Sequence, residues 1–284
     1  MTSARRFQQV DVFTTQALQG NGLAVVVDGD GLSDAQMAAL ARWTNLSETS
    51  FLLPPSDERA DYRVRIFTPS TELPFAGHPT LGSCHAWLAA GGRPKDPALV
   101  VQECGIGRVR IRRDDTPQGT RLAFAAPPRR RSGPLDTATV ERIARFLGVA
   151  PRDILAHEHC DNGPPWMAVM LASAEAVLAC RPALSSERQI DIGVIGRHAA
   201  GSDAAFEVRA FFPHGDALAE DPVTGSLNAA LAQWLIGSGR APARYVAAQG
   251  AALGRAGRVH VEQAGDEIWI GGHVTPCIAG TLRL

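Results

Sequence analysis

The hydrophobic and polar residues of this chain alternate in short runs, which is the pattern of β-strands that bury one face. In the first half the pattern predicts strands at 6–14, 22–28, 49–53, 61–67, 98–103, 107–113 and 120–126. Residues 33–44 instead repeat with helical period behind a capping box of Ser33 and Gln36, so we expect a helix there. A second helix is predicted from about Pro79 to Ala90, where nearly every residue is apolar.

The second half repeats this order of elements after a Pro- and Arg-rich linker at 127–134. It predicts a helix at 137–147, strands at 166–171 and 205–212, an apolar helix at 223–237, strands at 243–248, 257–263 and 266–271, and IAGTLRL at the end. We therefore predict an α+β fold of two pseudo-symmetric domains, each a mostly antiparallel or mixed, barrel-like sheet around a central helix. The predicted domains are 1–128 and 129–276, and the last strand, 277–284, is a candidate to complete the first domain.

A sheet that wraps a helix buries it on nearly every side. We therefore expect the apolar residues of both central helices to be mostly buried, namely Leu81, Ala86, Trp87 and Leu88 in the first and Leu227, Ala230, Leu231 and Leu235 in the second.

Each apolar helix begins with a similar motif, HPTLGS at 78–83 and DPVTGS at 221–226, which are 143 residues apart. A helix N-terminus has unpaired N–H groups and a partial positive charge, and glycine lets a ligand approach the backbone. One such motif alone is typical of a well-capped helix, for which Asp221 would be a good N-cap. The pair favours a site, in which two helix ends face each other across a cleft and bind a small carboxylate.

Composition excludes several classes of protein. The 284 residues are 45% hydrophobic and 20% charged with a net charge of −1, so we expect no nucleic-acid partner. There is no N-terminal apolar segment and no run of 18 apolar residues, which predicts a cytoplasmic protein with no membrane contact. The five cysteines are scattered and argue against a disulfide framework or structural zinc. Lys95, the single lysine, lies in a Pro-flanked turn, which disfavours a phosphate-binding loop or Schiff-base enzyme.

The chain resembles the phenazine biosynthesis-like (PhzF-like) isomerase family, which has the diaminopimelate-epimerase-like fold. The residues that carry the resemblance are DVFT at 11–14, GNGLAVV at 20–26, NLSETSF at 45–51, RIFTPSTELPFAGHPTLG at 65–82 and EDPVTGS at 220–226. Gly22 departs from the family, which usually has proline there. The resemblance implies an interdomain active site, a cofactor-free isomerase acting on a small carboxylate, and commonly a homodimer.

The family's catalytic carboxylate falls on Glu48. Glu48 lies between Leu46 and the apolar run that begins at Phe51, where desolvation would raise the pKa of a carboxyl and suit proton transfer at carbon. A solvent-facing glutamate is the alternative from the residues alone. The resemblance further implies that His78 and Asp221 are substrate partners or proton relays. It also implies that Ser47, Gly77, Gly225 and Ser226 bind the substrate.

Two other clusters contain residue types that occur in sites. His157–Cys160 (HEHC) has the residue types of a metal site, but its spacing favours a surface turn, and we expect no metal and no cofactor. Cys104–Arg108 (CGIGR) precedes an alternating segment rather than a helix, which predicts a hairpin turn and disfavours a two-thiol racemase. The remaining alternatives to the isomerase are a non-catalytic binding protein on the same scaffold and a two-base epimerase or racemase.

Overall fold

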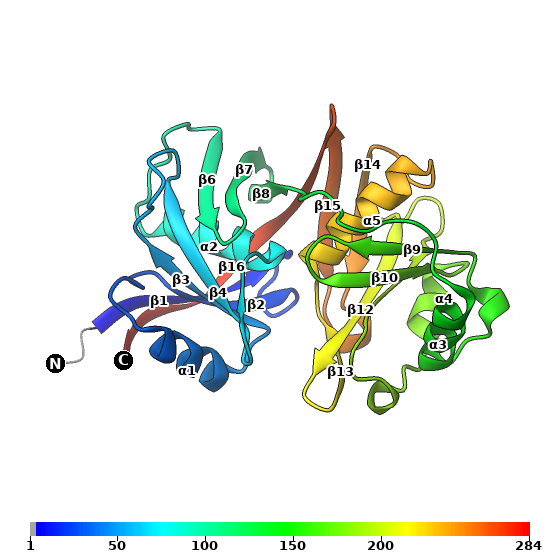
Figure 1. Cartoon of the computed structure of the whole chain (residues 1–284). Coiled ribbons are helices and arrows are strands. Elements are labelled where there is room, and N and C mark those ends of the chain that lie inside the picture. Colours follow the sequence, from blue (N-terminus) through cyan, green and yellow to red (C-terminus); the bar gives the residue numbers. More distant parts are fainter. Residues whose placement is uncertain (1–3) are drawn as a thin grey trace. The chain divides into compact units, whose positions relative to one another are not determined.

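The computed structural model describes residues 4–284 and divides into two compact units (Figure 1). Unit 1 comprises the chain through Ala125 together with Gly271–Leu284, and unit 2 comprises Ala126–Ile270. The predicted boundaries, 128/129 and 276/277, lie a few residues from these divisions. The returning segment starts earlier than 277 because the last strand already pairs with the first strand at Val274.

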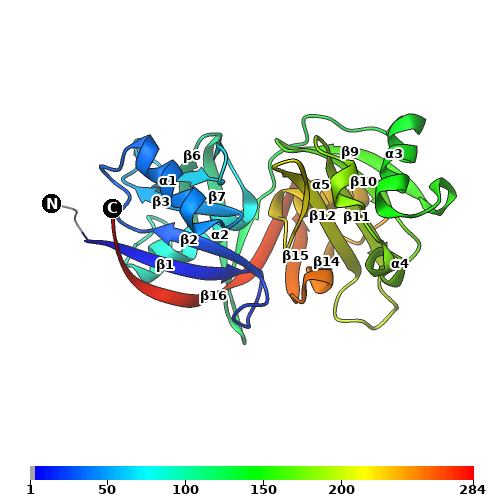
Figure 2. The ribbon, with the colours of Figure 1, turned by 90° about the horizontal axis from the view of Figure 1, so that it is seen from below.

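Unit 1 is a closed barrel of eight strands, which confirms the predicted barrel-like sheet. Its elements are β1 (Ala4–Val12), β2 (Asn21–Val26), α1 (Asp34–Thr44), β3 (Glu48–Leu53), β4 (Tyr62–Phe67), β5 (Glu72–Leu73), α2 (Gly77–Ala89), β6 (Leu99–Cys104), β7 (Gly107–Thr116), β8 (Gly119–Ala125) and β16 (Glu267–Arg283). The strands follow the order β1-β2-β3-β4-β6-β7-β8-β16, and antiparallel pairing of β1 with β16 closes the barrel (Figure 2). β5 lies outside this path and forms a hairpin with β4.

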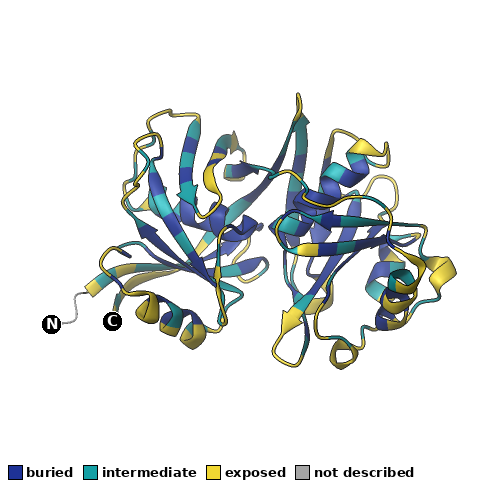
Figure 3. Cartoon of the chain, viewed as in Figure 1, coloured by how far each residue is buried: buried dark blue, intermediate teal, exposed yellow. Residues whose placement is uncertain are grey.

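Helix α2 packs against the strands of this barrel, and Figure 3 shows its burial. Leu81 and Ala86 are completely buried, as predicted, whereas Trp87 and Leu88 near its end are half-buried. The ring of Trp87 stacks on Tyr62 with 5.2 Å between centroids. Gly82 permits the close packing, because a Cβ there would lie 2.5 Å from Leu23 Cδ2. Helix α1 begins at the predicted capping box of Ser33 and Gln36, and it buries Met37 on the apolar face that its helical period predicted.

Unit 2 repeats the barrel-like sheet around a helix. Its elements are α3 (Thr137–Leu147), β9 (Ala156–Asp161), β10 (Pro165–Met170), α4 (Ala174–Ala179), β11 (Asp191–Arg197), β12 (Phe206–His214), β13 (Ala217–Asp221), α5 (Gly225–Gly237), β14 (Arg244–Gln249), β15 (Gly257–Ala264) and residues 267–270 of β16. The strand order is β9-β10-β11-β12-β14-β15-β16, with β13 paired to β12. The sheet is mixed because the β10–β11 and β12–β14 pairs are parallel.

Helix α5 is the central helix of unit 2. All four of the residues predicted to be buried there are buried, namely Leu227, Ala230, Leu231 and Leu235. Helices α3 and α4 contribute to a separate apolar cluster that includes Ile143, Val177 and Phe211.

Several elements differ from the prediction. The HEHC segment is not a surface turn but strand β9, which pairs with β10 through His159 and Met167. β9 terminates the strand order of its sheet, and its outer edge bonds to the preceding linker, where the His159 N–H donates to the Gly133 carbonyl and Arg131 forms a bridge with Asp161. Strand β11, helix α4 and the short hairpin strands β5 and β13 were not predicted, because they lie in segments with no sustained period.

Candidate active site

The two central helices begin in the same way, although not in the predicted register. α2 and α5 each have 13 residues and start at Gly77 and Gly225, which are 148 residues apart. The corresponding segments are therefore PFAG at 74–77 and PVTG at 222–225. The predicted shift of 143 was wrong, because it aligned two X-Pro dipeptides that occupy different places. His78 corresponds to Ser226, not to Asp221.

Glu48 and His78 lie together in unit 1. Glu48 is the first residue of β3 and His78 is in the first turn of α2, with 3.4 Å between Glu48 Oε2 and His78 Nδ1. Their side chains are only 15% and 4% exposed, so Glu48 is not the solvent-facing glutamate of the alternative interpretation. Burial lowers the pKa of His78 to about 3. The imidazole is therefore neutral near pH 7 beside a largely buried carboxyl group.

A neutral imidazole has one donor nitrogen and one acceptor nitrogen. His78 Nδ1 faces Glu48, and Nε2 is buried with no hydrogen-bond partner within residues 4–284. Two buried hydroxyl groups, Ser50 Oγ and Ser83 Oγ, also have no hydrogen-bond partner in that range. Ser50 follows Glu48 by two residues on β3, so both side chains point to the same side of the sheet. Neither serine was predicted, since a serine in an apolar strand or helix gives no distinctive signal.

The other predicted residues of unit 1 lie close in the sequence to this pair. Ser47 precedes β3 and is half-buried, and Gly77 is the first residue of α2. The N-cap of α2 is Ala76, which provides no side-chain oxygen to accept from the first N–H groups. The start of α2 is thus a helix N-terminus without a side-chain cap.

Asp221 lies in unit 2 as the last residue of β13, so the interpretation of Asp221 as an N-cap was wrong. The N-cap of α5 is Thr224, and its hydroxyl donates to Asp221 Oδ2 at 2.6 Å. Gln249, at the end of β14, accepts from the Thr224 N–H at 3.0 Å. Sequence analysis missed Thr224 and Gln249. Thr224 could have been recognised as an N-cap, because it directly precedes the glycine at which the helix begins.

Gly225 and Ser226 form the first turn of α5. The Ser226 hydroxyl accepts from Trp166 Nε1 at 3.0 Å, and its carbonyl accepts from Asn162 Nδ2 at 2.8 Å. Trp166 and Asn162 are buried and come from β10 and the β9–β10 turn. Unit 2 therefore brings together Asp221, Gly225 and Ser226, and unit 1 brings together Glu48 and His78.

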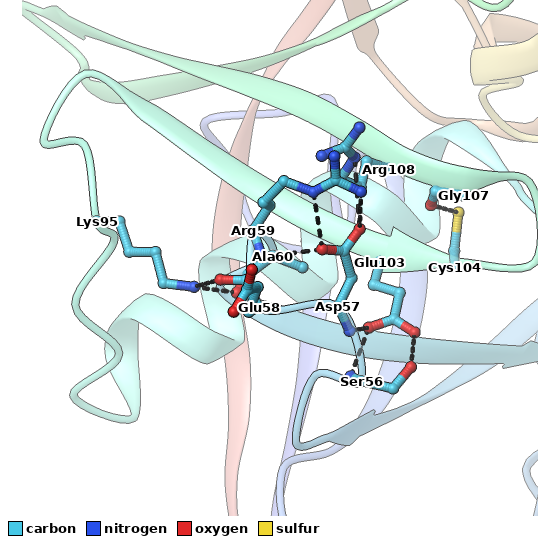
Figure 4. A network of polar contacts seen from close by, with 10 residues as sticks. All are labelled: Ser56, Asp57, Glu58, Arg59, Ala60, Lys95, Glu103, Cys104, Gly107 and Arg108. Carbon is cyan, nitrogen blue, oxygen red and sulfur yellow. Dashed lines mark hydrogen bonds and ion pairs between the residues drawn. The ribbon is translucent and has the colours of Figure 1, made fainter.

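The single lysine and the Cys104 motif lie in a surface network of unit 1 (Figure 4). Lys95 Nζ donates to the backbone carbonyls of Glu58 and Ala60, so its role here is structural. Cys104 and Gly107 flank the turn between β6 and β7, and Cys104 Sγ lies 3.5 Å from the Gly107 carbonyl oxygen. The predicted hairpin turn is confirmed.

The polar residues of β9 are engaged with the preceding linker. His157 Nδ1 accepts from the N–H of Leu135, and Glu158 pairs with Arg129 at 2.9 Å. Within residues 4–284, no group of three or more His, Cys, Asp or Glu side chains is placed to hold a metal ion. In the same range, none of the helices has the length and apolar character needed to cross a membrane.

Comparison with known proteins identifies the family. The family model described as "Phenazine biosynthesis-like protein" matches residues 10–280. The protein named "Uncharacterized isomerase" from Mesorhizobium japonicum is 35% identical, covering 98% of both chains. "Antisense-enhancing sequence 1" from Schizosaccharomyces pombe is 34% identical, covering 96% of this chain and 97% of its own. The crystal structure of a PhzF-family protein from Bacillus anthracis shares the fold, with a TM-score of 0.83 and 22% identity over 99% of this chain and 100% of its own. The chain therefore belongs to the phenazine biosynthesis-like (PhzC–PhzF) family.

Proposed function

We propose that this protein is a cofactor-independent isomerase that moves a proton between two carbon atoms of a small carboxylate, with Glu48 as the acid–base group. Family membership and the isomerase named among its relatives support an isomerase. The observation that carries the assignment of Glu48 is its contact with the buried, neutral His78. A carboxyl group beside a neutral imidazole can take a proton from carbon and return it.

The proposed reaction conserves all atoms. Glu48 removes a proton from a carbon whose C–H bond is acidified by a neighbouring unsaturated or carboxyl group. The electron pair of that bond moves into the adjacent π-system, and Glu48 returns the proton to a second carbon. His78, whose Nδ1 faces Glu48, orients the carboxyl group. The imidazole donates a hydrogen bond to Glu48 when Glu48 is ionised and accepts one when Glu48 carries the proton.

Substrate binding is assigned to the helix ends. N–H groups at the start of a helix favour an anion, so Gly77 and Gly225 are proposed to bind carboxylate or other polar oxygen atoms of the substrate. The Ser226 hydroxyl already accepts from Trp166, so its own proton is available to be donated to the substrate. Ser47 and Asp221 are proposed to bind further polar groups of the substrate.

The test is proton exchange in D₂O. We would incubate the protein with L-proline, trans-4-hydroxy-L-proline and methylitaconate, and extend the panel to cyclic dienols and hydroxy-amino acids that carry a carboxylate. Isomerisation or epimerisation places solvent deuterium on carbon whenever the carried proton exchanges before its return, which proton NMR detects. A non-catalytic binding protein would bind a member of the panel, measured by calorimetry, and exchange none of its carbon-bound protons.

Glu48→Gln separates catalysis from binding, because glutamine keeps the size and polarity but cannot carry the proton. Loss of general acid–base catalysis typically lowers kcat roughly 10²–10⁴-fold, while binding of the substrate is retained. The matched control is Glu175→Gln on the outside of unit 2, where the carboxylate is exposed. A Glu48→Gln variant with the wild-type kcat would exclude the proposed role of Glu48.

A further inference from the structure

A buried glutamine holds the segment that links Asp221 to helix α5. Gln249 is 1% exposed, and both ends of its amide group are fully used. Its Oε1 accepts from the Thr224 N–H at 3.0 Å and from Asn228 Nδ2 at 2.9 Å. Its Nε2 donates to the Asp221 carbonyl at 3.1 Å and to Thr224 Oγ1 at 2.9 Å. Four hydrogen bonds thus connect one side chain to residues 221, 224 and 228.

Unit 1 contains a similar buried glutamine with a shorter series of hydrogen bonds. Gln102, on β6, donates to Thr80 Oγ1 at 3.0 Å and accepts from the Tyr62 hydroxyl at 2.9 Å. Thr80 in turn donates to the Ala76 carbonyl, as Asn228 donates to the Thr224 carbonyl. The shared part of the arrangement therefore fixes the first turn of each central helix. Within residues 4–284, these hydrogen bonds continue to a carboxylate in unit 2 and not in unit 1.

The donor and acceptor roles along Gln249, Thr224 and Asp221 follow from the groups themselves. An amide N–H can only donate, so the Thr224 hydroxyl accepts from Gln249 and its single proton points to Asp221 Oδ2. The O···O distance of 2.6 Å is that of a short hydrogen bond, and a hydroxyl proton aimed at a carboxyl oxygen favours the ionised form of that carboxyl group. Gln249, Thr224 and Asp221 are all buried, so water competes little for these bonds.

We propose that Gln249 and Thr224 are positioning residues for Asp221: together they hold its carboxylate in one orientation and favour its ionised form. This inference rests on the proposed function, in which Asp221 binds a polar group of the substrate. Thr224 and Gln249 touch Asp221 rather than the reacting atoms. A carboxylate that must meet a small substrate loses much of its effect when it is displaced by even 1 Å, at a cost of up to roughly 10²-fold in rate.

The first test is structural and needs no substrate. Thr224→Val removes the hydroxyl at nearly constant shape, and Thr224→Ser keeps it. We expect the Asp221 side chain to leave its position in crystals of the Val variant and to keep it in the Ser variant. Gln249→Leu should release Asp221 in the same way, because it removes the donor that orients the Thr224 hydroxyl. An unmoved Asp221 in both Thr224→Val and Gln249→Leu overturns the inference.

The second test uses whichever compound of the D₂O panel the wild type turns over. Thr224→Val should lower kcat/KM roughly 10–10²-fold and move the acidic limb of the pH–rate profile to higher pH. Thr224→Ser should restore most of the rate. The matched control is Thr139→Val, since Thr139 donates to Asp136 with the same three-residue spacing at the start of α3, outside the site. It should leave both the rate and the profile unchanged.

The outcomes separate the two proposals. A wild-type rate and pH profile in Thr224→Val, in an enzyme that Glu48→Gln inactivates, would overturn this inference and leave the proposed function standing. If Glu48→Gln is fully active, the proposed function fails, and the crystal structures of the variants still decide whether Thr224 and Gln249 position Asp221. A loss of rate in Thr224→Val with an unshifted profile and no recovery in Thr224→Ser would show a purely structural role and also overturn the inference.

Discussion

Arg209 and Glu220 form a buried ion pair with two parallel hydrogen bonds of 2.8 Å each, and they hold the β12–β13 hairpin that ends at Asp221. Arg209 also donates to the backbone carbonyls of Val177 and Cys180 at the end of α4. Arg65 and Glu72 form a similar bidentate ion pair between β4 and β5 of unit 1, with hydrogen bonds of 2.8 and 2.7 Å. Each unit thus fixes the hairpin that leads into its central helix with the same Arg–Glu pair.

The two pairs differ in burial, and this predicts different costs. Arg209→Met leaves the Glu220 carboxylate, 9% exposed, without its partner, and should lower the free energy of unfolding by about 3–5 kcal/mol. Adding Glu220→Leu should recover most of that loss, because replacing a whole buried pair by apolar residues is often neutral. Arg65→Met, whose partners Glu72 and Asp34 are 41% and 81% exposed, should cost only about 1 kcal/mol or less. Urea unfolding measures all three, and equal losses for Arg209→Met and Arg65→Met would contradict the argument.

The close approach of α2 to the barrel predicts the effect of a single methyl group. A Cβ at Gly82 would lie 2.5 Å from Leu23 Cδ2 and 3.1 Å from side-chain carbons of Val10 and Val12. Gly82→Ala should therefore destabilise unit 1 by about 1–3 kcal/mol through overpacking. Gly237 ends the equivalent helix α5 and has no atom within 4 Å of such a Cβ within residues 4–284, so Gly237→Ala should be neutral or stabilising by about 0.5 kcal/mol. Thermal unfolding of both variants checks this, and a stabilising Gly82→Ala would show that the strands can move apart.

The sequence predicted the architecture because the fold depends on features that have a clear period. Helices that are apolar on all sides, such as α5, are recognisable without coordinates, and so are strands that alternate, such as β7. The repeat register was misjudged because His78-Pro79 and Asp221-Pro222 look alike although one pair lies inside a helix and the other before one. Local identity of two residues does not determine where a helix begins.

Only the site residues that lie within a recognisable motif were predictable from the sequence. Glu48 was found through the resemblance and His78 through its helix-start motif as well, and the structure adds that they are in contact. Gln102 and Gln249 could not be found, because a glutamine in an alternating strand is expected to face solvent. Both side chains are instead buried and hydrogen-bonded to residues distant in the chain. Such pairings depend on tertiary structure, which strand periodicity does not encode.

Asp191 predicts a stability that changes with pH. Burial, with a smaller effect of Asp161, raises the pKa of Asp191 to about 6, above the value of about 3.9 expected in the unfolded chain. The folded state therefore binds the proton more tightly, and the stability that this contributes is lost as the pH rises from about 4 through 6. Asp191→Asn stays neutral, so its free energy of unfolding should exceed that of the wild type by about 1–3 kcal/mol above pH 6 and much less at pH 4. Urea unfolding between pH 4 and 8 tests this; a difference that does not vary with pH would contradict it.

His78 predicts the opposite dependence on pH. Its folded-state pKa of about 3 lies below the unfolded value of about 6.5, so the unfolded chain binds a proton that the folded protein excludes. The wild type should lose stability as the pH falls from 6.5 toward 3, by up to ~1.4 kcal/mol per pH unit from this residue. His78→Gln cannot gain that charge, so any advantage of the wild type over this variant should shrink steadily on acidification. Urea unfolding of both proteins at pH 7.5, 6 and 4.5 measures the trend.

The sign of that trend also bears on the proposed chemistry. If Glu48, 3.4 Å away, held His78 as a charged partner, the folded-state pKa of His78 would be raised, and the advantage of the wild type would instead grow as the pH falls toward 6. A charged imidazole could only donate hydrogen bonds. Glu48 would then be kept ionised and would be a poorer acceptor for a proton from carbon. A shrinking advantage on acidification therefore supports a neutral His78 beside a carboxyl group that is free to change its protonation state, as the proposed isomerisation requires.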